Sequence, residues 1–165
     1  MQLWQMDVMG RAFMADGREM KTVTGIDDHS RFCVCAAVVP RATARPVCAA
    51  LVGALRRHAV PEQVSTDNGK VFTARFGLGP RPVLFDQVCH DNGIKHLLTA
   101  PYSPTTTGKV ERLHKTIRAE FLSVHDRQHA TAEQLRQALD RWVTKYHTER
   151  PHQSCGSRPA VERFA

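Results

Sequence analysis

The stretch that decides the fold is LWQMDVMGRAFMADGREMKTVTGIDDHSRFCVCAAVV, residues 3–39. It holds three runs rich in apolar and β-branched residues, and these predict extended segments over 3–9, 21–27 and 32–39. Asp16-Gly17 is a turn dipeptide, and a short polar connection follows the second run. Such short connections join antiparallel neighbours, so the stretch predicts a three-stranded meander.

Downstream of the meander, helical and extended patterns alternate. Thr43 can cap a helix that has Pro46 in its first turn and apolar residues at i, i+3, i+4 and i+7. Short runs predict strands over 62–66 and 94–99, with a short helix over 83–92 between them. Two longer helices are predicted over 107–124 and 131–146. This order predicts an α/β fold with a five-stranded mixed sheet, an antiparallel meander plus parallel strands, flanked by helices.

The two longer helices carry distinct faces. In the first, one apolar stripe is predicted from Val110, Leu113, Ile117, Phe121 and Val124. A second face of that helix combines an acid with cations: Glu111, Lys115 and Arg118. The second helix opens on a capping box and keeps an apolar stripe to its end, which predicts a core helix. Segments 72–82 and 100–108, rich in Gly and Pro, are expected to be loops.

Length, charge and hydrophobicity limit the classes of protein to which this chain can belong. A chain of 165 residues with 42% hydrophobic and 24% charged residues fits one globular domain. Its formal charge of +7 and pI near 9.5 favour a polyanionic partner, although solvated basic faces explain many such values. No apolar run reaches the roughly 18 residues of a membrane helix, and the start lacks a secretory pattern. We therefore expect a cytoplasmic protein without membrane contact.

The cysteines and histidines give no independent metal motif. The five cysteines are odd in number and form no C-x-x-C pair, so buried reduced thiols are expected. His125 and His129 have the i, i+4 spacing that can chelate a metal, but no H-E-x-x-H pattern accompanies them. A structural or surface role is the simpler interpretation of this pair.

Three carboxylates carry the chemistry that the sequence predicts. Asp7 lies within the first predicted strand, Asp67 at the end of the fourth, and Glu111 on a helix that would pack over the sheet. Converging carboxylates repel one another unless a cation neutralises them, and Mg²⁺ prefers such hard oxygen ligands. Two ions about 4 Å apart that share Asp7 would suit phosphoryl transfer.

The chain resembles the catalytic core of DDE transposases and retroviral integrases, and most closely the integrase-core domains of bacterial insertion-sequence transposases. Five motifs carry the resemblance in family order: LWQMD, GIDDHSRF, VSTDNG, SPTTTGKVER and YHTERPHQS. The resemblance implies a ribonuclease H-like fold, with a catalytic core over 1–146 and a C-terminal tail over 147–165. It also implies that Asp7, Asp67 and Glu111 are the catalytic, metal-binding triad.

The implied activity is metal-dependent DNA strand cleavage and strand transfer during integration or transposition. The cofactor would be Mg²⁺ or Mn²⁺, two ions bound together with DNA, and no small-molecule cofactor is implied. The partners would be transposon ends and target DNA, and the protein would act as a homodimer or higher multimer at the bacterial nucleoid. The DNA-binding residues implied are Asn68, Lys109, Arg112, Lys115, Arg118 and Arg150.

The chain departs from the family pattern outside the triad. Four positions carry uncommon residues: Thr107, His147, Cys155 and Arg158. Glu111 follows Asp67 by 44 positions, which exceeds the usual gap, and we assign the excess to segment 72–82. Only six residues precede Asp7, whereas relatives carry a helix-turn-helix region there, so we expect a catalytic core with weak sequence preference of its own.

Two rival functions remain open. A catalytically silent DNA-binding relic would keep the fold and the basic face, and loss of a triad carboxylate would support it; none is lost. A ribonuclease H-like nuclease would be expected to have a fourth clustered carboxylate. Asp27 or Asp28 could supply it, although a turn explains both residues more simply.

Overall fold

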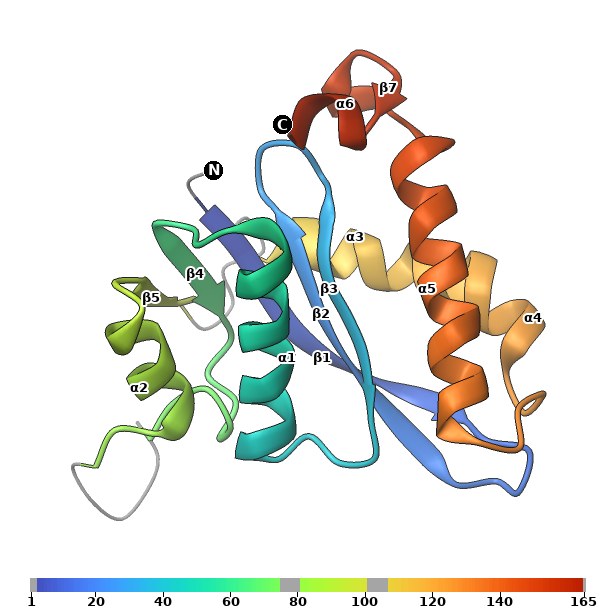
Figure 1. Ribbon diagram of the computed structural model, residues 1–165, viewed down its shortest axis with the longest axis horizontal. Coiled ribbons are helices and arrows are strands. Elements are labelled where there is room, and N and C mark those ends of the chain that lie inside the picture. Colours follow the sequence, from blue (N-terminus) through green and yellow to red (C-terminus); the bar gives the residue numbers. More distant parts are fainter. Residues whose placement is uncertain (1–2, 75–80, 101–106, 165) are drawn as a thin grey trace.

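The computed structural model describes residues 3–74, 81–100 and 107–164, and these form a five-stranded sheet with helices on both faces (Figure 1). The strands are β1 (Leu3–Phe13), β2 (Glu19–Asp27), β3 (Cys33–Val39), β4 (Gln63–Thr66) and β5 (Lys95–Leu98). Their order is β3-β2-β1-β4-β5. β1, β2 and β3 pair antiparallel, whereas β4 pairs parallel with β1 and with β5. The predicted mixed sheet is confirmed.

The first hairpin is longer than the sequence pattern indicated. β1 continues to Phe13 because the pairing with β2 resumes beyond an irregularity between Met9 and Ala12, where Ala12 faces Met20. Such a bulge locally kinks the strand and interrupts the alternation on which a strand is recognised. The predicted turn is present, and Gly17 takes a φ of 87°, which favours glycine.

Helices divide the core into two layers. α1 (Ala44–His58) and α2 (Leu84–Asp91) pack on one face with Trp4, Val64 and Phe85. On the other face lie the helical segments that follow β5, together with the apolar residues Ile26, Val110 and Phe121. These segments are α3 (Gly108–Thr116), a π-helical turn η1 (Ile117–Leu122), α4 (Ser123–His125) and α5 (Ala132–Thr148). Asp7 lies between Met6 and Val8, which face the first layer, and its side chain therefore faces α3.

The caps of the two best predicted helices differ. Thr131 and Gln134 form the predicted capping box at the start of α5. Thr43 precedes α1 as predicted, but its side chain makes no capping hydrogen bond. Pro46 occupies the third helical position and has no N–H for the Thr43 hydroxyl to bind. Thr43 is therefore the N-cap residue of α1, as expected, but its side chain does not cap the helix.

The helix predicted over 107–124 is not uniform. Its segment Ile117–Leu122 is π-helical, with hydrogen bonds between residues i and i+5. The wider turn changes the phase of the buried stripe, so Leu122 joins Phe121 in the core and Val124 is 65% exposed. The prediction that Val124 belongs to the buried stripe is wrong, because that stripe assumed α-helical spacing throughout.

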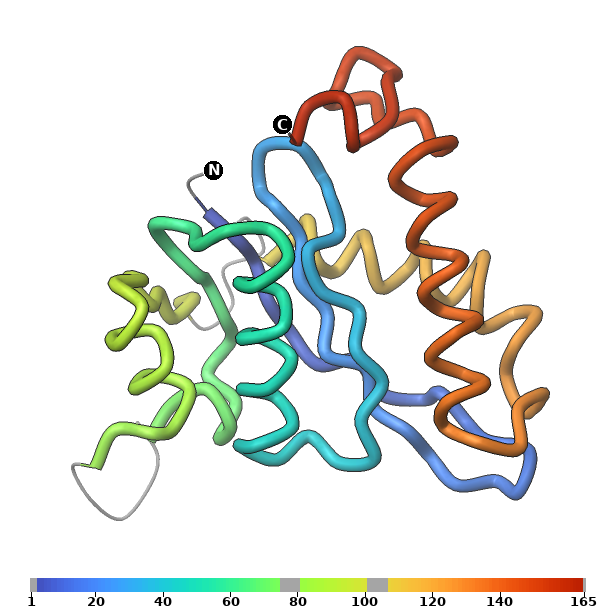
Figure 2. The backbone as a smooth tube through the Cα atoms, viewed as in Figure 1, coloured from blue at the N-terminus to red at the C-terminus, as the bar shows by residue number. Residues whose placement is uncertain are grey.

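The C-terminal segment turns back over the meander. It consists of β6 (Pro151–His152), the 3-10 turn η2 (Gln153–Cys155), β7 (Arg158–Pro159) and α6 (Val161–Phe164), and β6 pairs with β7. Figure 2 shows this segment folding back at the end of α5 toward the connection between β2 and β3. Phe32 stacks between His147 and Phe164, with ring centroids 3.6 and 3.9 Å away. The Sγ of Cys155 donates to Ser30 O at 3.2 Å.

All five cysteines are buried and free, which confirms the expectation of reduced core thiols. No helix in the described part of the chain is long and apolar enough to cross a membrane. Residues 75–80 and 101–106 lie outside the described residues. Most of the two loops expected over 72–82 and 100–108 therefore has no structural account.

Candidate active site

The three carboxylates of the predicted triad come from three elements around one end of α3. Asp7 lies in the middle of β1 opposite Thr24, Asp67 directly follows β4, and Glu111 lies in the first turn of α3. The pKa of Asp7 is raised to about 6, chiefly by burial and also by the negative charges of Asp67 and Glu111, against the opposing effects of the Val8 N–H and the positive charge of Arg118. The structure therefore brings the three acids into electrostatic contact.

Each carboxylate is oriented through one oxygen. Val8 N donates to Asp7 Oδ1 at 2.8 Å, Gly69 N donates to Asp67 Oδ1 at 2.9 Å, and the Thr107 hydroxyl donates to Glu111 Oε1 at 2.9 Å. The second oxygen of each carboxylate accepts no hydrogen bond from the residues described. Three hard oxygen donors with a free face are the chemistry that Mg²⁺ or Mn²⁺ prefers.

The acids are near one another without forming a closed metal cage. Across residues 3–74, 81–100 and 107–164, no group of three or more His, Cys, Asp and Glu side chains is placed to hold a metal ion. Unneutralised carboxylates repel one another, and this repulsion favours separated side chains. The donor set thus fits a divalent ion in its chemistry, and Asp67 and Glu111 would have to approach Asp7 to enclose one.

A threonine and a histidine hold the backbone at Asp7. The Thr24 hydroxyl donates to Asp7 O at 3.1 Å, so it must accept from Nε2 of His114, 2.6 Å away. That leaves Nδ1 of His114 as an acceptor, 3.9 Å from Asp7 Oδ2. Burial lowers the pKa of His114 to about 4, helped by the charge of Arg118. The imidazole is therefore neutral at pH 7, and its contact with Asp7 is not an ion pair.

A similar pair supports Asp67. The Thr66 hydroxyl donates to Asp67 O at 3.1 Å and lies 2.7 Å from His96 Nε2. On the other side of the ring, His96 Nδ1 lies 2.5 Å from Asp86 Oδ1. A threonine hydroxyl thus donates to the backbone carbonyl of Asp7 and of Asp67, and a histidine ring contacts each of these threonines. These contacts hold the two backbone segments in place.

Sequence reasoning missed these supporting residues. Thr66 immediately precedes Asp67, and His114 lies one helical turn after Glu111, so both positions were visible in the sequence. Thr24 is recognisable only from the register of β1 and β2, which places it directly opposite Asp7.

We expect Thr24→Val to destabilise the fold by roughly 1–3 kcal/mol, because it leaves Asp7 O and His114 Nε2 without their partner. Urea unfolding monitored by circular dichroism measures this loss. Thr22→Val is the matched control: Thr22 is buried on the same strand and face, and its hydroxyl has no hydrogen bond among the described residues. Equal unfolding free energies for the two variants would show that the Thr24 contacts are unimportant.

The residues predicted to bind DNA have separate environments. Arg118 is close enough to influence the pKa values of both Asp7 and His114. Asn68 donates its amide to Thr99 O at 2.8 Å and so joins the ends of β4 and β5. Lys109 pairs with Asp28, with 2.5 Å between Nζ and Oδ2.

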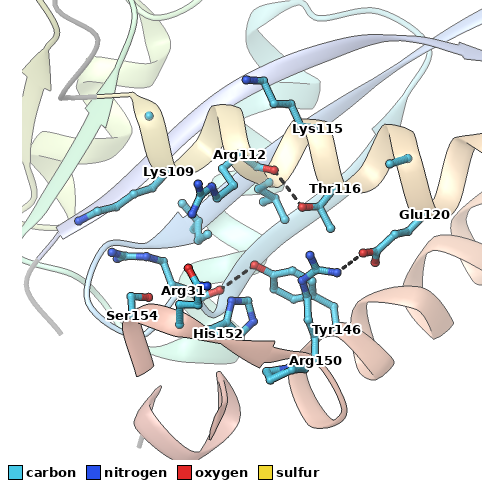
Figure 3. A pocket seen from close by; sticks show the side chains of 16 residues that line it. Arg31, Lys109, Arg112, Lys115, Thr116, Glu120, Tyr146, Arg150, His152 and Ser154 are labelled. Atoms are coloured by element: carbon cyan, nitrogen blue, oxygen red, sulfur yellow. Dashed lines mark hydrogen bonds and ion pairs between the residues drawn. The ribbon is translucent and has the colours of Figure 1, made fainter. Parts of the chain in front are cut away.

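The remaining predicted cations, Arg112, Lys115 and Arg150, line a pocket of about 720 Å³ between α3 and the C-terminal segment. Figure 3 shows these side chains around the pocket. Arg150 forms an ion pair with Glu120 across it.

The acids proposed as a fourth cluster member have structural partners. Asp27 Oδ2 accepts from the backbone N–H and the hydroxyl of Ser30, which closes the turn after β2. Asp28 pairs with Lys109 and accepts from Gln5 Nε2 at 2.8 Å. These contacts support the turn interpretation of both acids.

His125 and His129 contact each other. Their Nδ1 and Nε2 atoms lie 3.0 Å apart, and the His125 ring stacks on Phe121. The contact supports the structural role preferred for this pair.

Comparison with known proteins places these features in context. Two family models, both described as integrase core domain, match residues 1–104 and 92–159. The chain is 31% identical, over 96% of its length, to the uncharacterized 39.2 kDa protein of insertion element IS476 from Xanthomonas euvesicatoria. It is 28% identical, over 92% of its length, to the uncharacterized 31.7 kDa protein of insertion element IS407 from Burkholderia multivorans. The chain spans 43% and 50% of these two relatives.

Solved structures share the fold. The catalytic core domain of HTLV-2 integrase, in complex with magnesium in a dimeric form, matches with a TM-score of 0.74 at 17% identity, over 99% of this chain and 96% of that one. A chain of the simian T-cell lymphotropic virus intasome in complex with PP2A regulatory subunit B56 gamma matches with a TM-score of 0.78 at 20% identity, over 99% of this chain and 54% of that one. The expected ribonuclease H-like fold is confirmed.

Proposed function

Because the chain belongs to the integrase core domain family, we propose that it cleaves DNA strands and joins them to target DNA with the help of divalent metal ions. The observation that carries this proposal is the environment of Asp7. Its carboxylate is half-buried, and this burial, together with the charges of Asp67 and Glu111, raises its pKa to about 6. Such a perturbed acid group beside further carboxylates is typical of a functional site.

In this proposal Asp7, Asp67 and Glu111 would hold Mg²⁺ or Mn²⁺. The bound ions would activate a water or a 3′ hydroxyl and stabilise the leaving oxygen of the phosphodiester. The protein orients the three carboxylates through Val8 N, Gly69 N and Thr107 Oγ1, and it supports the backbone at Asp7 and Asp67 through Thr24 and Thr66. Each acid therefore keeps a free oxygen for the metal.

The partner proposed is DNA, both transposon ends and target. The net charge of +7 favours a polyanion, and Arg118 adds a positive charge near the carboxylates, where a scissile phosphate would lie. We also propose that the protein works as a homodimer or higher multimer in a bacterial host. The dimeric and trimeric forms of the HTLV-2 integrase core and the bacterial sources of the insertion-element relatives support this.

Two alternatives compete with this proposal. A catalytically silent relic would bind DNA without turnover, but all three carboxylates are present and each keeps an unbonded oxygen among the residues described. A ribonuclease H-like nuclease would use a fourth acid, whereas Asp27 closes a turn and Asp28 pairs with Lys109. Strand transfer is therefore the function that the site supports best.

Asp67→Asn tests the proposal in a strand-transfer assay with Mg²⁺ or Mn²⁺. The substrate is fluorescent branched DNA that mimics a joined product. The assay therefore measures the reverse of strand transfer, which uses the same site. We expect the rate to fall about 10³-fold, since metal ions supply several kcal/mol to such transition states. Asp140→Asn, an exposed acid on α5, is the matched control and should leave the rate unchanged. Equal rates for Asp67→Asn and the parent would rule out the proposed metal-binding triad. A parent protein that is inactive with both Mg²⁺ and Mn²⁺ would favour the catalytically silent relic.

A further inference from the structure

The pocket beside α3 carries positive charge that no residue described here neutralises. It lies between α3 with its π-helical extension, the connection from β2 to β3, and the C-terminal segment (Figure 3). Five of its lining residues form what we call the basic pocket: Arg31, Arg112, Lys115, Arg150 and His152. They come from three distant parts of the sequence, and the fold gathers them at one place.

Arg31 is held in a backbone conformation that ordinarily disfavours its side chain. Its φ is 65°, in the left-handed region where glycine or asparagine is usual. Two hydrogen bonds keep it there: Arg31 N donates to Asp27 O at 3.0 Å, and the Tyr146 hydroxyl donates to Arg31 O at 3.2 Å. Tertiary contacts therefore fix the position of Arg31 against its local backbone preference.

The guanidinium of Arg31 has no hydrogen-bond or ion-pair partner among the described residues. Its Nη1 is buried and makes no hydrogen bond, and the side chain forms no ion pair with any described residue. His152, also in the pocket, has a buried Nε2 without a partner. A buried guanidinium nitrogen that lacks an acceptor is costly in a folded protein, and an acceptor bound from outside would satisfy Arg31 Nη1.

The other cations of the basic pocket differ in how far they are neutralised. Arg150 is paired with Glu120, whereas Arg112 and Lys115 have no acidic partner among the described residues. Lys109, which also lines the pocket, is already paired with Asp28. Arg31, Arg112 and Lys115 therefore leave the pocket with a net positive charge that attracts an anion.

We propose that the basic pocket binds a phosphate group of the DNA backbone, with Arg31 and Arg112 as its principal ligands. Arginine presents a planar fork of N–H donors that matches the oxygens of a phosphate. The identity of the anion as DNA rests on the proposed function, whereas the anion site itself rests on the unpartnered Arg31 nitrogen and the positive charge of the pocket.

The position of the pocket favours DNA over an acidic peptide. Arg112 directly follows Glu111 on α3, so the pocket and the carboxylates lie on neighbouring faces of one helix. A helix with its side chains is about 10–12 Å across, so one DNA strand that crosses α3 can contact both places. A phosphate held in the pocket would fix the strand relative to the carboxylates.

Fluorescence anisotropy with a labelled random-sequence DNA duplex tests the proposal on the whole 165-residue chain. Arg31→Gly removes the side chain and relieves the strained φ, so the variant should melt at or above the temperature of the parent. We expect Arg31→Gly and Arg112→Gln each to weaken DNA binding about 10-fold and to reduce the slope of log affinity against log salt by about 1. Arg56→Gln removes an exposed arginine from α1, on the opposite face of the sheet, and serves as the matched control.

The outcomes separate the pocket from the catalytic proposal. Binding by Arg31→Gly and Arg112→Gln equal to that of Arg56→Gln would overturn the pocket proposal, whatever the strand-transfer assay shows. Loss of binding in both variants would support it, even if Asp67→Asn proved fully active and the catalytic proposal failed. A polyglutamate peptide that bound the parent more tightly than DNA at equal salt, and lost its affinity in the same variants, would overturn DNA as the occupant.

Discussion

Replacement of Asp7 by asparagine is expected to reduce strand transfer about 10⁴-fold, more than replacement of Asp67, because Asp7 is the carboxylate on which the charges of both other acids act and so the central donor of the proposed metal site. Asparagine keeps the size of the side chain and lacks the negative charge. The position is central: Asp7 lies mid-strand on β1 and is influenced by the charges of both other acids. The measurement is the single-turnover rate on the branched DNA substrate with Mg²⁺ or Mn²⁺.

Asp91→Asn provides the matched control for this result. Asp91 is 78% exposed at the end of α2, which packs on the opposite face of the sheet from α3, and its replacement should leave the rate unchanged. Binding of the random-sequence duplex by Asp7→Asn in the absence of metal should equal or exceed that of the parent, since a negative charge has been removed. A residual rate within 10-fold of the parent would show that Asp7 does not bind the catalytic metal.

The second large effect of Asp7→Asn is on stability: the replacement that lowers activity should stabilise the metal-free fold at pH 7. Asp7 has an ordinary pKa of 3.8 that burial, Asp67 and Glu111 raise to about 6. The folded protein therefore holds this proton more tightly than the unfolded chain, and in metal-free buffer its stability falls as the pH rises from about 4 to above 6. At about 1.4 kcal/mol per pKa unit, the parent at pH 7 should be less stable than Asp7→Asn by up to about 3 kcal/mol.

Urea unfolding of the parent and Asp7→Asn at pH 4 and pH 7, with a chelator present, measures this difference. The gap between the two proteins should be small at pH 4 and reach its full size at pH 7. Saturating Mg²⁺ at pH 7 should then stabilise the parent, because it binds only the folded state, and should stabilise Asp7→Asn much less. A gap that does not change with pH would contradict the raised pKa of Asp7.

Much of the site was predictable because its acids lie in local patterns. Asp7 interrupts an apolar run, and Asp67 ends one, so their places on β1 and after β4 follow from strand periodicity and turn chemistry. Glu111 follows from helical spacing beside Val110. The antiparallel pairing of the first three strands and the parallel pairing of the other two also followed, since short connections give antiparallel neighbours and the intervening helices allow parallel ones.

The features that sequence reasoning missed depend on long-range placement. Thr24 faces Asp7 only through the register of two strands. Arg31 and His152 come together only because the chain after α5 turns back over the meander. Val124 was misplaced because a π-helical turn carries no distinct apolar period, and it appears in this helix where the core accepts Phe121 and Leu122 side by side. None of these follows from a window of neighbouring residues.

The stack of Phe32 between His147 and Phe164 has a consequence for the order of folding. It ties the connection that carries Arg31 to residues at the opposite end of the chain. Contacts of such large sequence separation form slowly, because the intervening loop must first be closed at an entropic cost. The meander can pair as soon as its own residues leave the ribosome, but the Arg31 turn acquires its final support only after α6 has been synthesised.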